Sequence, residues 1–239
     1  NQVKETVTFA ENNGIKVVYD SGENIYASTE LLSESNLEID LARKKLFIES
    51  CNKQNIDPTI LTERLLTLKD TPMLIIGDSI VDEYAACEAL GMSAEAPVVV
   101  VKELDSKDFY GGASIVASHI NALGAHCDFL SVIGNDENAN IIKTQLSAEG
   151  ITCDLIVDNS RPTTFKKRYV VENQKLFRVS RLNDHSLSKS IENKFIEKLE
   201  QIAPDVNGIV VSDFVYGVIT PKIISKVIEL SKKYNFKIF

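Results

Sequence analysis

The sequence predicts an α/β fold in which helices cover both faces of a mostly parallel β-sheet, with a small antiparallel β lid. From Thr71 onward, short apolar strands alternate with helices that end at glycines. Residues 163–181 break this rhythm, because two strands with period-2 alternation follow one another with no helix between them. The 239 residues are 44% hydrophobic, which is enough for a buried core and excludes intrinsic disorder.

The elements follow in order from these patterns. The helix 113–123 is predicted because Ala113, Ala117 and Ile120 share one face and Gly124 ends the pattern. Further helices are expected at 135–149 and 222–233. Strands of the main sheet are expected at 73–76, 129–133, 151–157, 209–212 and 236–239. We expect the hairpin strands 163–171 and 176–181 to join residues 98–102 in the lid, which would occupy about 84–110 and 162–182.

Two stretches precede this α/β region. Residues 35–70 carry helical periodicity, with Asp57-Pro58 as an N-cap and first-turn proline, and are predicted to form a helical connector before the region 71–239. Residues 1–34 contain an expected strand, Ile15–Tyr19, with no obvious partner. The chain also stops within an apolar strand that begins at Tyr234. These features indicate a fragment of a longer protein.

Composition excludes several classes of function. The formal net charge of −8 and the pI near 5.0 argue against binding to nucleic acid, which requires a basic face. The longest apolar run, Ala96–Val101, is far shorter than the roughly 20 residues that cross a bilayer, so no membrane segment is expected. The four cysteines are widely spaced, which predicts reduced thiols in a cytoplasmic protein and no structural metal site.

Carboxylates follow the first strand of the predicted sheet. Asp78 and Asp82 come directly after strand 73–76, at the sheet edge where open parallel sheets bind ligands. There they can accept hydrogen bonds from sugar hydroxyls, and we expect Asp78 to lie in a solvent-lined cleft. The alternative is that Asp78 caps the following turn. Asp213 follows strand 209–212 in the same way and is a candidate site residue or, alternatively, a helix cap.

Paired glycines and basic residues complete the candidate set. Gly111 and Gly112 open the helix 113–123 and would let a ligand approach the backbone, although ordinary turns also use such pairs. Lys166 and Arg168 share one face of the hairpin and Arg178 lies on its returning strand, so the three can clamp a phosphate group. The alternative is an exposed strand edge protected by charge.

Together these motifs resemble the ribokinase-like (PfkB-type) carbohydrate kinases, in particular the heptose-phosphate kinase half of bifunctional ADP-heptose synthases. The resemblance covers residues 73–217 and rests on the order and spacing of eight short elements. These are Ile76-Gly-Asp-x-x-x-Asp82, Ser93-Ala-Glu-Ala-Pro-Val98, Gly111-Gly-Ala113, Ala122-Leu-Gly-Ala125, Ile133-Gly-x-Asp-Glu137, Pro162-Thr163 with Lys166 and Arg168, Gln174-x-Leu-x-Arg178, and Ser212-Asp213.

The resemblance implies a three-layer α/β/α fold and transfer of the γ-phosphoryl group of ATP, with Mg²⁺, to a hydroxyl of a sugar or sugar phosphate. It also implies a homodimer through the lid. By position, the residues that would hold sugar hydroxyls are Asp78, Asp82, Gly111 and Gly112. Those that would contact sugar or phosphate from the lid are Lys166, Arg168 and Arg178, and Asp213 would border the phosphoryl-transfer region.

The chain also departs from the family pattern. Ile115, Ser180 and Tyr216 stand where the family has an asparagine, an acidic residue and a lysine. The Gly-Ala-Gly-Asp segment with the family's catalytic base, and most of the ATP site, would lie beyond Phe239, so no catalytic residue is assigned. A non-catalytic sugar-binding or regulatory module is therefore the alternative. Residues 17–32 resemble the closing segment of cytidylyltransferase-like domains, which implies that residues 1–34 are the remnant of such a domain.

Overall fold

The computed structural model describes residues 36–172 and 174–239, so the expected strand 15–19 and the cytidylyltransferase-like segment lie outside the described residues. The chain divides into two compact units, residues 1–61 and 62–239. The described part of the first contains helix α3 (Asn36–Lys53), and helix α4 (Pro58–Leu66) spans the boundary. Asp57 caps α4 as predicted, because its Oδ1 accepts the Thr59 N–H at 2.7 Å.

The second unit contains a five-stranded parallel main sheet, in the order β4-β3-β1-β7-β8. Its strands are β1 (Pro72–Met92), β3 (His126–Ile133), β4 (Thr152–Val157), β7 (Gly208–Ser212) and β8 (Lys237–Ile238). Strand β1 contributes only its first residues, which pair with β3 up to Asp78 and with β7 up to Gly77.

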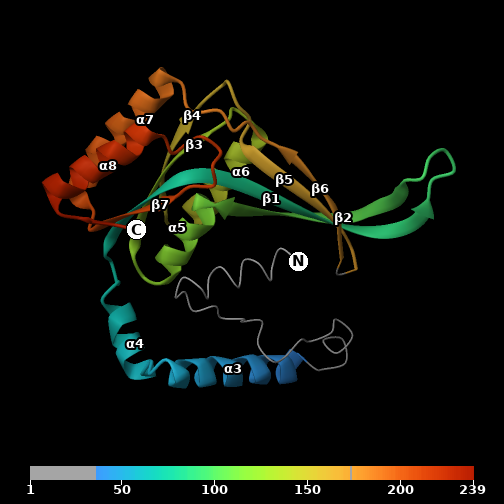
Figure 1. Cartoon of the computed structure of the whole chain (residues 1–239), viewed down its shortest axis with the longest axis horizontal. Helices are drawn as coiled ribbons and strands as arrows, with labels where there is room; N and C mark the ends of the chain where they lie inside the picture. The colour runs from blue at the N-terminus through green and yellow to red at the C-terminus, as the bar shows by residue number, and fades with distance from the viewer. Residues whose placement is uncertain (1–35, 173) are drawn as a thin grey trace, which may run out of the picture. The chain divides into compact units, whose positions relative to one another are not determined.

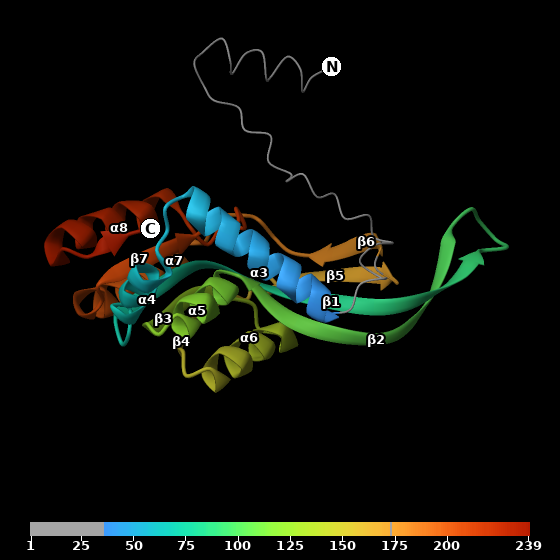
Figure 2. The same cartoon turned by 90° about the horizontal axis from the view of Figure 1, so that it is seen from below.

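Helices cover both faces of the main sheet, as Figure 2 shows for α7 and α8 on one side and α5 and α6 on the other. Their bounds are α5 (Ala113–Ala122), α6 (Glu137–Ala148), α7 (Lys189–Ile202) and α8 (Pro221–Tyr234), with a short 3₁₀ turn at Ala203–Asp205. The predicted α/β fold is confirmed. Helix α7 was not among the predicted elements, and its Ser188 N-cap accepts the Ile191 N–H at 3.3 Å.

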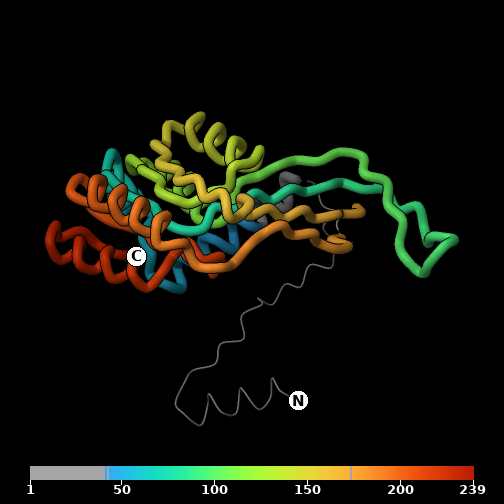
Figure 3. Tube along the Cα trace, turned by 90° about the horizontal axis from the view of Figure 1, so that it is seen from above, coloured from blue at the N-terminus to red at the C-terminus, as the bar shows by residue number. Residues whose placement is uncertain are grey.

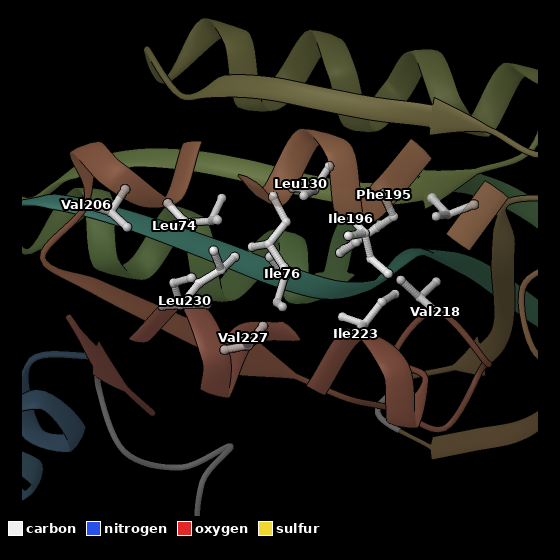
Figure 4. Close-up of a cluster of buried hydrophobic side chains, with 14 of the residues drawn as sticks. Leu74, Ile76, Leu130, Phe195, Ile196, Val206, Val218, Ile223, Val227 and Leu230 are labelled. Carbon is white, nitrogen blue, oxygen red and sulfur yellow. The ribbon is translucent and has the colours of Figure 1, made fainter. Parts of the chain in front are cut away.

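Alternation along β1 divides the core into two clusters. Leu74 and Ile76 point to the α7/α8 side, where they join Phe195 and Ile223, and all four side chains are fully buried (Figure 4). Ile75 points to the other side and packs with residues of α5 and α6. Because strand side chains alternate between the two faces, a strand buried on both faces has an unbroken apolar run.

A second sheet continues from the same strand. Beyond Asp78, β1 pairs antiparallel with β2 (Val99–Gly112) and parallel with β5 (Thr164–Val171), and β5 pairs antiparallel with β6 (Gln174–Arg181). We call these four segments the lid sheet, in the order β2-β1-β5-β6. The β1–β2 hairpin projects beyond β5 and β6 (Figures 1 and 3), since pairing with β5 stops at Cys87.

The lid sheet differs in two respects from the predicted arrangement. The first strand does not end near Ile76 but runs through Met92, so its second half separates residues 98–102 from the hairpin. The pairing of β1 with β5 is also parallel, which makes the lid sheet mixed. The hairpin itself has the predicted antiparallel pairing.

Candidate functional site

The crossing of β1 from one sheet to the other positions the candidate site. Gly77 has φ +151°, and a Cβ there would lie 2.0 Å from the Ser212 carbonyl oxygen of β7. Only glycine allows the two strands to approach this closely. The main sheet therefore brings Asp78, on β1, beside the segment that follows β7.

Asp78 does not lie in the expected solvent-lined cleft, because the residue is only 1% exposed. Its carboxylate accepts the N–H groups of Phe214, Tyr216 and Val218 at 2.8, 3.3 and 3.2 Å. Burial raises the pKa of Asp78, an effect that these three donors oppose and that the nearby charge of Asp213 reinforces. Asp78 thus holds the loop after β7, residues 213–218. The sequence alternative was that it caps the turn directly after its own strand, whereas its partners lie in this distant loop.

The paired glycines bring β2 close to β1. A Cβ on Gly111 would lie 2.7 Å from Asp82 Oδ2, and one on Gly112 would lie 2.3 Å from the Asp78 carbonyl oxygen. Gly112 is also the N-cap of α5, with φ +63° and no side-chain cap. The expected close approach at this pair is therefore made to the backbone and carboxylate of β1.

One face of the lid sheet collects charged residues from three strands. Register places Asp82 opposite Lys166, and Arg168 opposite both Tyr84 and Arg178. Arg168 forms an ion pair with Asp82, and its guanidinium lies 5.2 Å from the centroid of the Tyr84 ring. Arg178 is exposed beside Arg168. Four predicted site residues on one face can therefore offer both an acceptor for hydroxyl groups and donors for an anion.

Lys166 connects this face to the loop 213–218. The residue is 8% exposed, and its Nζ lies 4.9 Å from the centroid of the Tyr216 ring. Asp213 is exposed, and its Oδ1 accepts the Val215 N–H at 2.8 Å in a local turn. Asp213 thus lies on the loop that Asp78 holds and that Lys166 contacts.

Sequence reasoning missed two parts of this arrangement. The rings of Tyr84 and Phe109 pack edge to face on the charged face, with their centroids 5.7 Å apart. This contact was not predicted, because it depends on the pairing of the second half of β1 with β2. Arg161, immediately before the Pro162-Thr163 motif, is 7% exposed and donates to the Tyr216 carbonyl at 3.0 Å. Its position between two recognised elements was the only signal in the sequence.

The larger cavities do not coincide with the predicted site. Two cavities of about 400 and 500 Å³ share Asn135 and Asp136, which precede α6, and a third of about 410 Å³ is lined by Asp108 and residues of α6. Of the eight predicted residues, Asp78 lines a cavity of about 10 Å³, next to Arg161 and Tyr216. Among residues 36–172 and 174–239, no group of three or more acidic, histidine or cysteine side chains is arranged to hold a metal ion. Within the same ranges, no helix is long and apolar enough to cross a membrane.

A sequence model for the pfkB family of carbohydrate kinases matches residues 71–237. Two similar curated proteins are both named Bifunctional protein HldE. The one from Campylobacter jejuni is 34% identical over 174 residues, or 72% of this chain and 36% of that protein. The one from Geobacter sulfurreducens is 36% identical over 161 residues, or 67% of this chain and 33% of that protein. The chain thus spans about a third of the length of these relatives.

Solved structures of low sequence identity share the fold. The tetrameric inhibited form of phosphofructokinase-2 from Escherichia coli has a TM-score of 0.52 at 12% identity and covers 70% of this chain and 53% of its own. A carbohydrate kinase from Agrobacterium tumefaciens has a TM-score of 0.50 at 10% identity and covers 70% of this chain and 52% of its own. The second unit therefore shares the ribokinase-like fold over about half of the length of these kinases.

Proposed function

Because the chain belongs to the pfkB family of carbohydrate kinases, we propose that it carries the acceptor-binding part of a kinase that phosphorylates a sugar or sugar phosphate. The observation that carries this proposal is the charged face of the lid sheet, where Asp82, Lys166 and Arg168 lie together. The glycine pair and the loop 213–218 border the same face. A carboxylate beside several cations matches an acceptor that has both hydroxyl groups and a phosphate.

Each residue type has a role in this proposal. Asp82 accepts hydrogen bonds from sugar hydroxyls, and Gly111 leaves room for that carboxylate, since a Cβ there would lie 2.7 Å from Asp82 Oδ2. Lys166, Arg168 and Arg178 neutralise the phosphate of the acceptor. Asp78 acts indirectly, since both of its oxygens already accept backbone N–H groups. Such groups suffice for the acceptor half because phosphoryl transfer depends mainly on positioning and charge neutralisation.

We assign the phosphoryl donor as ATP with Mg²⁺ on the grounds of family membership. The described residues do not contain a metal-binding group, so no step is derived through the metal ion. As acceptor we favour a heptose-phosphate-like sugar, because the matched relatives are HldE proteins and the charged face carries three cations. We also propose that the protein is cytoplasmic. By its position in the family pattern, Asp213 would border the transferred phosphoryl group.

A homodimer through the lid is part of the same proposal. The β1–β2 hairpin exposes large apolar side chains beyond its pairing with β5, among them Leu90, Met92 and Val99, which are 58–62% exposed. Such a surface, at the open edge of a small sheet, is suited to pairing with a second copy. Sedimentation of the intact protein before and after Met92→Lys would test this, and an unchanged mass for the variant would contradict it.

A second candidate function is a non-catalytic sugar-binding or regulatory module. It is favoured by the internal use of Asp78 and by the presence of Ile115, Ser180 and Tyr216 at family positions. This function predicts saturable binding of a sugar phosphate that ATP does not change, as measured by calorimetry.

The main test is ADP release by the full-length protein with phosphorylated and neutral sugars. We expect Arg168→Ala to raise KM for the phosphorylated sugar at least about tenfold and to affect a neutral sugar much less. Arg181→Ala is the matched control, because this exposed arginine stacks over Phe165 on the other face of the same strand pair. No turnover across a broad sugar panel, or equal effects of Arg168→Ala on both sugar classes, would contradict the proposal.

A further inference from the structure

A buried ion pair lies in the segment that connects β4 of the main sheet to β5 of the lid sheet. Arg161 Nε donates to Asp158 Oδ2 at 2.9 Å, and the two side chains are 4% and 5% exposed. Arg161 stands shortly before β5, and Asp158 directly follows β4. Buried pairs of this kind contribute little to stability when compared with apolar residues of the same size, so their presence calls for another explanation.

The remaining nitrogens of Arg161 join two distant segments. Nη1 donates to the Tyr216 carbonyl at 3.0 Å, and Nη2 donates to the His185 carbonyl at 2.7 Å. Tyr216 belongs to the loop 213–218 after β7, whereas His185 follows β6. The guanidinium of Arg161, which precedes β5, therefore hydrogen-bonds both to the segment after β6 and to the loop 213–218 after β7.

That loop has a backbone conformation that needs support. Val215, a β-branched residue, has φ +63°. Gly217 has φ +85°, and a Cβ on this residue would lie 2.3 Å from the His185 carbonyl oxygen. A β-branched residue in this region is strained and persists only when its surroundings fix it. The three N–H groups bound to Asp78 and the carbonyl bound to Arg161 supply that support.

Arg161 is almost fully buried, because its side chain is only 4% exposed and each of its three nitrogens donates to the protein. It borders a cavity of about 10 Å³ with Asp78 and Tyr216 and another of about 500 Å³ with Asn135 and Ser160. The first cavity holds about one water molecule, and the second is lined by none of the eight predicted site residues. The contacts that connect Arg161 to the predicted acceptor site therefore run through the loop 213–218.

We propose that Arg161 is a positioning residue for the acceptor site: by holding the Tyr216 backbone, it fixes the Tyr216 ring against the Lys166 ammonium and so orients the cationic face of the lid. The chain of contacts runs from Arg161 to the Tyr216 carbonyl, and from the Tyr216 ring to Lys166 Nζ at 4.9 Å. This role rests on the proposed function for its effect on the acceptor, but its structural part is independent of any activity.

The test compares Arg161→Lys with Asp158→Asn in the full-length protein. Lysine keeps the charge but cannot reach Asp158 and both carbonyls with one planar group. In Asp158→Asn the single amide oxygen can accept from Arg161 Nε or from the Ser160 N–H, whereas the carboxylate accepts from both. The bonds from Arg161 to the carbonyls of Tyr216 and His185 do not involve residue 158. Hydrogen exchange of a peptide spanning residues 212–220 reports on the loop directly, because Asp78 protects three of its amides.

We expect Arg161→Lys to speed exchange in that peptide at least about tenfold and to raise the acceptor KM by a similar factor, with a smaller change in kcat. Asp158→Asn should lower the thermal midpoint as much as Arg161→Lys does, but it should leave the amides of the loop protected from exchange. Lys198→Ala, which removes an exposed pair with Asp154, should change neither measurement. If Arg161→Lys does not fold, Arg161→Gln replaces it in the same comparison.

Two results would overturn the proposal. One is unchanged exchange of the loop in the arginine variant, and the other is an increase spread evenly over all peptides, which would mean a general loss of stability. Loop exchange that rises while the acceptor KM stays constant would overturn the effect on the acceptor. If the unsubstituted protein turns over no sugar, the proposed function fails, whereas the exchange experiment still decides whether Arg161 holds the loop.

Discussion

The main sheet and the lid sheet share strand β1, yet they are stabilised by different interactions. In the main sheet, β1 is buried on both faces between two apolar clusters. Beyond Asp78 the same strand stays buried through Val81 and alternates between exposed and buried positions only from Tyr84 to Glu88. Its neighbours there contribute ion pairs and cation–π contacts. The difference separates an apolar core from a charged face along a single strand, with the change beyond Val81. Substitutions on either side of it should therefore have different consequences.

The largest difference is expected between two glycines of β1. Gly77→Ala would place a Cβ 2.0 Å from the Ser212 carbonyl oxygen, whereas a Cβ on Gly91 in the lid hairpin would meet nothing within 4 Å. Both glycines have positive φ, at +151° and +106°, so backbone strain is common to both. We expect Gly77→Ala to cost more than about 5 kcal/mol of unfolding free energy and Gly91→Ala about 1–3 kcal/mol.

Urea denaturation of both variants measures this difference. Similar losses for the two would mean that strain alone, and not the approach of β1 to β7, determines the requirement for glycine at Gly77.

Two phenylalanines sharpen the comparison. Phe195 on α7 is fully buried in the core, whereas Phe109 on the lid is 44% exposed. Phe195→Ala should cost about 3–5 kcal/mol, because it leaves a cavity in a packed core. Phe109→Ala should cost less than about 1 kcal/mol and act mainly on acceptor binding. Equal losses of stability in denaturation curves would show that the lid sheet folds as part of the core.

The sequence predicted the main sheet well because its signals are local. Apolar runs such as residues 73–76 and glycine stops such as Gly124 depend on neighbours a few residues away. Helix α7 carried a signal of the same kind, since Ile191, Phe195 and Leu199 share one face, and it could have been predicted. The second half of β1 could not, because its mixed polar and apolar residues form a strand only through pairing with β2 and β5.

The candidate site was predictable as a set of residues but not as a geometry. That Asp82 meets Lys166 and Arg168 follows from a parallel register between segments about 80 residues apart. Asp78 shows the reverse case. Its position at the end of a parallel strand indicated a ligand group, but the residues that occupy it lie more than 130 positions later. No local pattern contains that information.

Alkaline pH should affect the main sheet through its buried thiols. Burial raises the pKa of Cys127 from 9.0 to about 12, with a smaller contribution from the charge of Asp128. Between these values the unfolded chain loses the thiol proton and the folded chain keeps it, so stability falls as pH rises. Cys127 alone should contribute a loss of about 1.4 kcal/mol per pH unit above pH 9. Cys127→Ala should flatten urea midpoints measured from pH 9 to 11, and an unchanged slope would contradict this origin.

Salt should affect the lid sheet, and by the smallest amount. Lys167 Nζ contacts Glu83 at 2.7 Å and Glu103 at 2.8 Å, across the strands of the lid. The hydrogen bonds to Glu103 and Glu83 raise the pKa of Lys167, so this lysine stays charged through the neutral range. Because these side chains are partly exposed, Lys167→Met should cost at most about 1 kcal/mol at low ionic strength, and less as salt screens the charges.

Hydrogen exchange of peptides from β1 and β5 at 20 mM and 500 mM NaCl (about 21 Å and 4 Å of screening length) would measure this locally. Lys198→Met, which removes the more exposed pair with Asp154 at 2.8 Å, is the matched control in the main sheet. A salt response that is equal in the two variants would mean that the lid is held by packing, as the main sheet is.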